Sequence, residues 1–144
     1  MRFREATIED YEYMAINSIN QKVDRKMEDT VDYAYTLEDD GKPLGMGGFR
    51  MITSTTAWAW VDLSHEAGKN IITAYRVIRD WMIDFCEKMN IKRLQAFVRT
   101  DFPEAERLVQ HLGFEKESKM VGFFDDKDAW MYVKFLSETK CSTK

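Results

Sequence analysis

The sequence predicts an α/β domain of the α+β kind, with a mixed, mainly antiparallel sheet of seven strands, a central parallel strand pair and about four helices. Apolar residues recur at alternating spacings of four and three over 66–90, which indicates one face of a long helix. Strand-like segments lie on either side of it, at 55–64 and 91–100, so the helix predicts a crossover between parallel strands. Short strands separated by turn signals elsewhere favour antiparallel pairing.

The chain is predicted to open with a strand and a helix. Residues 1–7 read as a short strand, and Thr7 followed by Asp10 forms the capping-box pattern that starts a helix over 8–20. A second helix is predicted over 22–34, where the apolar positions form only a thin stripe. These segments predict the order strand, helix, helix.

A glycine-rich hairpin is predicted next, over 33–54. Its turn is the Asp-Gly pair within 39–42, the strongest short hairpin signal. The second strand contains three closely spaced glycines, Gly45, Gly47 and Gly48. Glycines inside a strand usually mark a bulge or a close backbone approach, so this strand is predicted to bend or to let something lie against it.

The second half of the chain predicts a helix followed by a hairpin. The helix over 102–113 has Pro103 near its start and Gly113 just past its end, the usual asymmetry of helix termini. Residues 114–136 predict the final two strands. The polar tail 137–144 is predicted to fray, which leaves one domain over 1–136.

Composition narrows the classes of function. A chain of 144 residues with 44% hydrophobic residues is long enough to bury a core without disulfides or metals. The net charge of −4, with acidic and basic residues interspersed, gives no broad basic field for nucleic acid. The N-terminus is too charged for a signal peptide, and no apolar run approaches the length of a membrane span. We therefore expect no nucleic-acid or membrane partner and a cytoplasmic location.

The histidines and cysteines predict neither a metal site nor a thiol nucleophile. His65 and His111 are the only histidines, too few for a histidine-rich metal site. Cys86 lies in a helical pattern and reads as a small core residue, and Cys141 lies in the polar tail. This pair resembles no disulfide framework, which favours a reducing compartment.

The segment "VRTDFPEAERLVQHLGFE" carries a family resemblance. Ala105 and the pair Gly113-Phe114 stand at the spacing of N-x-x-A-x-x-x-Y-x-x-x-G-F, a segment of the GNAT superfamily of N-acyltransferases, and the order of elements resembles that family over nearly the whole chain. The resemblance implies a GNAT-like fold with a coenzyme A cleft between the fourth and fifth strands. Phe102 replaces the asparagine, and Val109 replaces the tyrosine that often protonates the leaving thiolate.

The resemblance also implies a cosubstrate site for acetyl-coenzyme A. The family's pyrophosphate loop, Q/R-x-x-G-x-G/A, aligns with "HEAGKN", in which only Gly68 matches outright. Backbone amides at the start of a helix attract anions. The resemblance implies that the loop binds the pyrophosphate and that the preceding strand binds the pantetheine arm. The residues implied in these contacts are Trp60, Val61, Leu63, His65, Ala67, Gly68, Lys69 and Asn70. The sequence supports an alternative equally well: a plain capped helix, in which Ser64 is the N-cap and the negative charge of Glu66 interacts favourably with the helix dipole.

Asp62 is the nearest candidate for a catalytic base. Many members of the family use a water-linked acidic residue on the fourth strand, and the resemblance places Asp62 there. The alternative, a solvated carboxylate at a strand end, is the more common role for such a residue. No residue suits a covalent intermediate, so direct attack of an amine on the acetyl group is expected.

A second hypothesis is a GNAT-fold binding or structural protein that has lost its chemistry. The departures from the family motifs favour it, and "RLVQHLGF" loosely resembles small GNAT-like proteins of tailed bacteriophages, some of them thought to be virion or host-takeover components. Phe123 and Phe124 are adjacent in a strand and cannot both face one core, which hints at a homodimer or a protein partner there. The acceptor amine has no recognisable code in the sequence.

Overall fold

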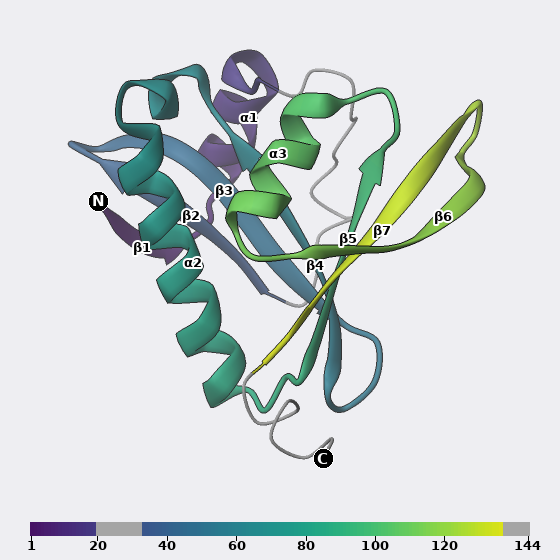
Figure 1. Ribbon diagram of the computed structural model, residues 1–144. Coiled ribbons are helices and arrows are strands. Elements are labelled where there is room, and N and C mark those ends of the chain that lie inside the picture. Colours follow the sequence, from purple (N-terminus) through teal and green to yellow (C-terminus); the bar gives the residue numbers. More distant parts are fainter. Residues whose placement is uncertain (20–32, 137–144) are drawn as a thin grey trace. The chain divides into compact units, whose positions relative to one another are not determined.

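The computed structural model describes residues 1–19 and 33–136 (Figure 1). Seven strands form one sheet in the order β1-β2-β3-β4-β5-β7-β6. The strands are β1 (Arg2–Glu5), β2 (Tyr33–Asp39), β3 (Lys42–Met51), β4 (Thr56–Leu63), β5 (Arg93–Arg99), β6 (Glu115–Phe124) and β7 (Lys127–Phe135). The helices are α1 (Ile8–Asn17), the 3₁₀-helix η2 (His65–Asn70), α2 (Ile71–Lys88) and α3 (Pro103–His111).

The sheet is mixed, as the sequence predicts. β4 and β5 run parallel, with Thr56 opposite Arg93 and Trp58 opposite Gln95. The pairs β1–β2, β2–β3, β5–β7 and β6–β7 are antiparallel. The mainly antiparallel sheet with a central parallel pair is therefore confirmed.

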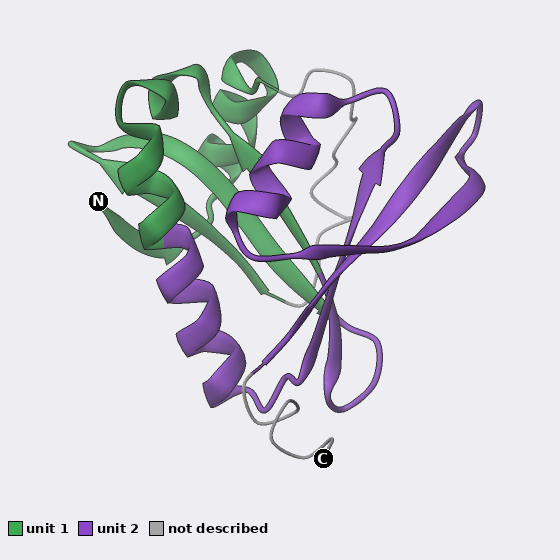
Figure 2. Cartoon of the chain, in the orientation of Figure 1, with its two compact units in different colours: residues 1–50, 59–77 green, residues 51–58, 78–144 purple. Residues whose placement is uncertain are grey.

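The chain divides into two compact units (Figure 2). Unit 1 comprises residues 1–50 and 59–77, and unit 2 comprises 51–58 and 78–144, so the division falls within β4 and within α2. The single domain over 1–136 stays a prediction. The tail 137–144 lies outside the described residues.

In unit 1, β1, β2 and α1 are joined by the Asp10 cluster, which consists of Arg4, Thr7, Asp10 and Thr36. Arg4 donates to both oxygens of Asp10, at 2.7 and 2.9 Å, and Thr36 Oγ1 donates to Asp10 Oδ2 at 2.9 Å. The Thr7 amide donates to the same carboxylate, which completes the predicted capping box. Burial alone would raise the pKa of Asp10, but these hydrogen bonds outweigh it and lower the pKa to about 2.

The β2–β3 hairpin turns at Asp40 and Gly41, whose φ angles of 51° and 77° suit the tight turn that the Asp-Gly pair predicts. Further along, Leu37 pairs with Gly45 while Glu38 pairs with Pro43. Leu44 is therefore an extra residue in β3, a bulge that shifts the register.

Unit 2 holds β5 between the parallel partner β4 and the antiparallel partner β7. The buried residues Leu94, Ala96 and Val98 alternate along β5, and α3 packs on this strand. Gly113 ends α3 with a φ of 95°, a conformation that glycine adopts without strain. The Pro–Gly pattern of this helix is confirmed.

The edge strand β6 is irregular near its end. Met120 pairs with Ala129 and Phe124 with Lys127, so residues 121–123 form a wide bulge opposite Asp128. Gly122 has a φ of 69°, and its amide donates to Asp128 Oδ1 at 2.8 Å. Phe123 stays 43% exposed, although its ring lies 4.7 Å from that of Phe97.

The helices differ from the prediction in two respects. Within residues 1–19 and 33–136 the structure has three α-helices rather than about four. The helix predicted over 22–34 falls mostly outside the described residues, and Tyr33 and Ala34 at its end belong to β2. The helix predicted from residue 66 begins instead as η2, and its α-helical part starts at Ile71.

Candidate active site

The candidate site in unit 1 lies where β4 ends and η2 begins. Asp62 and Ser64 are two residues apart, so they share one face of the extended chain. Both are buried, with exposed fractions of 7% and 1%. The Ser18 hydroxyl donates a hydrogen bond to Asp62 Oδ1. The solvated-carboxylate alternative for Asp62 is therefore wrong, because this side chain is buried and bonded within the protein.

The segment that leaves α1 places Ser18 against β4. Ser18 caps α1 in an extended conformation, with φ −69° and ψ 142°, and its amide donates to the Met14 carbonyl at 3.0 Å. Ser18 then forms an antiparallel bridge with Ser64, and the Ile19 amide donates to the Leu63 carbonyl at 2.9 Å. Ser18 was not predicted from the sequence, where its one signal is that of a small polar residue just past a helix end.

Ser64 is fixed by the bulge in β3. Its amide donates to the Leu44 carbonyl at 2.8 Å, and its hydroxyl donates to the Pro43 carbonyl at 3.1 Å. Ser64 precedes η2 in the N-cap position, but its side chain makes no capping hydrogen bond. The capped-helix alternative is therefore incomplete, because the hydroxyl on which it depends is bonded elsewhere.

Two glycines of β3 let β4 approach closely. A Cβ atom on Gly45 would lie 2.8 Å from the Asp62 carbonyl oxygen, and one on Gly47 would lie 3.0 Å from that of Trp60. Neither distance accommodates a side chain without a shift of the backbone. The close backbone approach predicted for this strand is confirmed, and the neighbour is β4.

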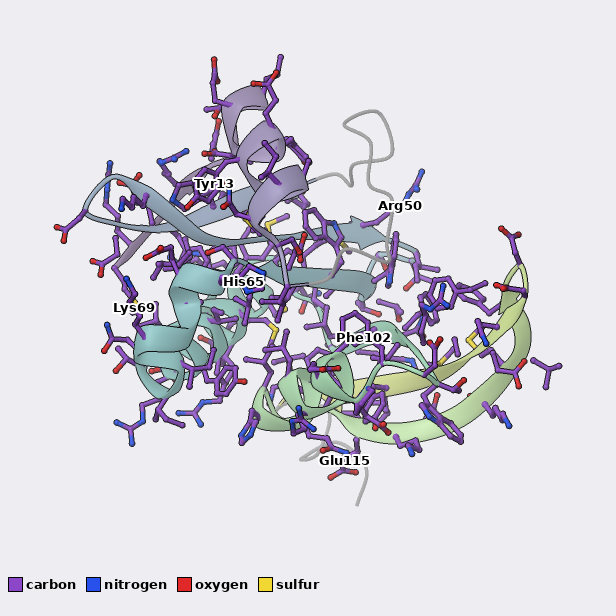
Figure 3. The ribbon with its side chains drawn as sticks, turned by 90° about the horizontal axis from the view of Figure 1, so that it is seen from above. Tyr13, Arg50, His65, Lys69, Phe102 and Glu115 are labelled. Atoms are coloured by element: carbon purple, nitrogen blue, oxygen red, sulfur yellow. The ribbon has the colours of Figure 1, made fainter. Side chains whose placement is uncertain are left out.

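The loop predicted to hold pyrophosphate is the 3₁₀-helix η2. His65, Gly68, Lys69 and Asn70 are exposed, whereas Ala67 is buried; Figure 3 labels His65 and Lys69 on this helix. The Ala67 amide donates to the Ser64 carbonyl at 3.1 Å, so the first amide of the predicted cradle is already used inside η2.

Neither the backbone conformation at Gly68 nor its neighbours within the protein require a glycine at this position. A Cβ atom there would meet nothing within 4 Å, and its φ lies outside the left-handed region. The space beside it is open to a ligand. The neighbouring Lys69 forms an exposed ion pair with Glu66 at 3.3 Å. Lys69 therefore partly neutralises the Glu66 carboxylate, which would otherwise compete with a bound anion for the start of the helix.

Unit 2 carries the positions of the second family segment. Phe102 and Val109 are both buried, so neither the asparagine nor the tyrosine position offers a polar group. The buried Tyr132 donates to Glu106 Oε2 at 2.5 Å. Burial and this carboxylate raise the pKa of Tyr132 well above its ordinary value, which makes it a poor proton donor.

Other chemistry finds little support in the described part of the chain. Cys86 is fully buried, and burial raises the pKa of its thiol to about 12, so the thiolate is scarce at neutral pH. Among residues 1–19 and 33–136 there is no cluster of three or more histidine, cysteine or acidic side chains that could hold a metal ion. In the same residues, no helix has the length and apolar character needed to cross a membrane.

Comparison with known proteins gives matches in structure alone. No protein-family model and no curated protein sequence matches the chain. Ard1 from Thermoplasma volcanium superposes with a TM-score of 0.77 at 15% identity, covering 94% of this chain and 97% of that one. A chimera of spermidine N-acetyltransferase SpeG from Vibrio cholerae and hSSAT gives 0.74 at 17% identity, covering 98% and 99%.

A third neighbour is the ribosomal-protein-S18-alanine N-acetyltransferase from Escherichia coli, with a TM-score of 0.74, 14% identity and 94% coverage of both chains. The chain has the GNAT fold. At identities this low the likeness establishes the fold alone, because one fold hosts many functions.

Proposed function

We propose that the protein is an N-acetyltransferase that moves an acetyl group from acetyl-coenzyme A to an amine. The proposal rests on one observation: the β4–η2 junction of this GNAT fold carries a buried carboxylate, Asp62, six residues before an open glycine, Gly68. The solved N-acetyltransferases that share the fold along nearly their whole length support the reaction class.

The cosubstrate would bind along this junction. Its pyrophosphate would lie against the backbone from Ala67 to Asn70, with Gly68 allowing close approach and Lys69 adding positive charge. The Ala67 amide would have to exchange the Ser64 carbonyl for a phosphate oxygen. This exchange costs little in a 3₁₀-helix, where hydrogen-bond geometry is poorer than in an α-helix.

The pantetheine arm would pair with the backbone of β4 from Trp60 to Leu63, and His65 would flank it at the start of η2. The Leu63 carbonyl already accepts the Ile19 amide at 2.9 Å. Pairing as far as Leu63 would therefore replace this bond. Pairing at Trp60 and Val61 does not compete with the Ile19 amide.

Asp62 would act as the base. An amine that arrives as an ammonium ion must lose a proton before its nitrogen can attack, and an ionised carboxylate can accept that proton. The nitrogen then forms a bond to the acetyl carbon while the carbon–sulfur bond breaks, and the thiolate leaves. The nitrogen, positively charged after the attack, releases a second proton to water to give the neutral amide. Val109 has no proton to supply, so the thiolate takes its proton from water.

Calorimetric titration with acetyl-coenzyme A tests the binding step. We expect micromolar affinity for the wild-type protein and at least a tenfold loss in Gly68→Glu, which puts bulk and negative charge against the pyrophosphate, a loss worth about 1.4 kcal/mol. Ile83→Glu is the matched control. It adds the same charge to an exposed position of α2 and should change the affinity less than twofold.

Equal affinity in wild type and Gly68→Glu would reject the loop as the pyrophosphate site. No binding in either would reject the enzyme and favour the second hypothesis, a GNAT-fold protein that works through a protein partner. If binding is found, a panel of primary amines assayed for coenzyme A release identifies the acceptor class. An unchanged pH–rate profile in Asp62→Asn would then remove Asp62 as the base.

A further inference from the structure

We propose that Ser18 is a positioning residue for Asp62. The Ser18 hydroxyl donates a hydrogen bond to the Asp62 carboxylate and holds it in place. Its consequence for the reaction rests on the proposed function, in which Asp62 takes a proton from the amine. The hydrogen bond itself joins residues 44 positions apart in sequence. It does not depend on any assumption about the substrate.

The backbone holds Ser18 in one place. Its own amide is bonded to the last turn of α1, and the following amide, of Ile19, is bonded to the Leu63 carbonyl at 2.9 Å. Between these two anchors Ser18 lies opposite Ser64 in an antiparallel bridge. Asp62 is two residues from Ser64 and so is a diagonal neighbour of Ser18 on the same face. The short serine side chain therefore has little freedom to leave the carboxylate.

Strand β4 is also held along the edge that faces β3. Ser64 bonds to two successive carbonyls of the β3 bulge, those of Pro43 and Leu44. The glycine at 45 brings the β3 backbone close to the Asp62 carbonyl. Asp62 is thus attached to a strand end that is fixed by β3 on one edge and by the chain leaving α1 on the other. A base fixed in this way needs no reorientation before it accepts a proton.

The chemistry of the contact favours the ionised carboxylate. Ser18 is 3% exposed and Asp62 is 7% exposed, so water reaches neither side chain freely. Burial disfavours the charged form of an acid, whereas a donated hydrogen bond favours it. The Ser18 hydroxyl donates to Asp62 Oδ1, so its hydrogen bond supports the ionised form. This combination suits a group that must take up and release a proton in each cycle.

Ser64 provides a matched comparison. It is the same residue type, is 1% exposed and is the direct partner of Ser18 in the bridge, but its hydroxyl donates to the Pro43 carbonyl. Removing either hydroxyl therefore deletes one buried hydrogen bond from the same strand end. Only the removal of the Ser18 hydroxyl deletes a donor to the Asp62 carboxylate.

The test compares Ser18→Ala, Ser64→Ala and the conservative variant Ser18→Thr with the wild-type protein. The first readout is the titration of the Asp62 carboxyl carbon by carbon-13 NMR, with the resonance assigned by its loss in Asp62→Asn. We expect its midpoint to rise by about one pH unit in Ser18→Ala, to stay near the wild-type value in Ser64→Ala, and to return toward it in Ser18→Thr. The acid limb of the pH–rate profile should move with it.

Each result decides the proposal. An unchanged midpoint in Ser18→Ala, or an equal rise in Ser64→Ala, overturns it, because the effect would be absent or due to general loosening. A moved midpoint with an unmoved pH–rate profile also overturns the positioning role and removes Asp62 as the base. Titration of the same variants with acetyl-coenzyme A distinguishes a wrong role for Ser18 from a wrong proposed function. Failure of the wild-type protein to bind would reject the enzyme, while the NMR midpoint would still report on Ser18.

Discussion

Among the described residues of unit 1 two aspartates are buried, and they accept hydrogen bonds from different kinds of donor. Asp10 accepts hydrogen bonds from a guanidinium, a backbone amide and a threonine hydroxyl, which lower its pKa to about 2 against the opposing effect of burial. Asp62 accepts a hydrogen bond from the neutral hydroxyl of Ser18. The exposed fractions of the two residues are similar, 3% and 7%.

The comparison shows that a buried aspartate can serve the structure alone. A carboxylate bonded to Arg4 is fixed in its charged form over the whole physiological range, so it can join β1, β2 and α1 but cannot exchange protons usefully. Burial alone therefore does not mark an aspartate as catalytic.

The largest expected effect comes from Asp10→Asn. This change removes the negative charge from a buried partner of Arg4 and should destabilise the protein by about 3 kcal/mol, because breaking a buried ion pair leaves the other charge poorly compensated. Urea unfolding measures it. Asp62→Asn is the matched variant, and it should cost only about 1 kcal/mol because the amide oxygen still accepts from Ser18. Equal losses would mean that the two sites are held alike.

The next effect is the acid dependence of stability. The folded pKa of Asp10, about 2, lies below its ordinary value of 3.8, so its contribution is present above about pH 4 and is lost as the pH falls toward 2. Its size is about 2 kcal/mol. Unfolding free energies measured between pH 5 and pH 2 should fall less steeply in Asp10→Asn than in wild type. Parallel curves would contradict the assignment.

The smallest effect is expected for Glu38→Gln. Glu38 accepts from Arg2 and from Arg4, both at 2.6 Å, and these bonds lower its pKa, with Arg4 the larger cause. The Arg2 side chain is 72% exposed, and a glutamine oxygen can still accept a hydrogen bond from an arginine, so thermal unfolding should shift by no more than about 2 °C. If Glu38→Gln lowered the unfolding temperature as much as Asp10→Asn does, Glu38 rather than Asp10 would be the main stabilising partner of Arg4.

The sequence predicted most of the fold because its signals are local. The Asp-Gly turn, the Thr7–Asp10 capping box and the Pro103–Gly113 asymmetry each fix an element within a few residues, and all three are confirmed. The start of the long helix was misplaced because helical spacing alone does not distinguish a 3₁₀ turn from an α turn. The glycines of β3 predicted a close approach but not the neighbour, which comes from 13 or more residues further along the chain.

The candidate site was only partly predictable. Asp62 and Gly68 were found because they lie in a continuous stretch beside a family motif, and their roles stay predictions. The Ser18 contact was not found, because it joins residues 44 apart and Ser18 carries no motif. The burial of Asp62 was also missed, since an aspartate at a strand end is usually solvated. The loose resemblance to bacteriophage proteins stays a prediction as well.

The bulge in β6 has a consequence for the behaviour of the protein at high concentration. An outermost strand with a regular ladder invites another extended chain to join it, and growth of this kind leads to ribbons and fibrils. Here Asp128 holds residues 121–123 out of register, and the preceding stretch alternates acidic and basic side chains. An incoming strand would not find evenly spaced partners along this edge. The bulge therefore disfavours the addition of a further strand beside β6, even though Phe123 and Val121 are exposed there.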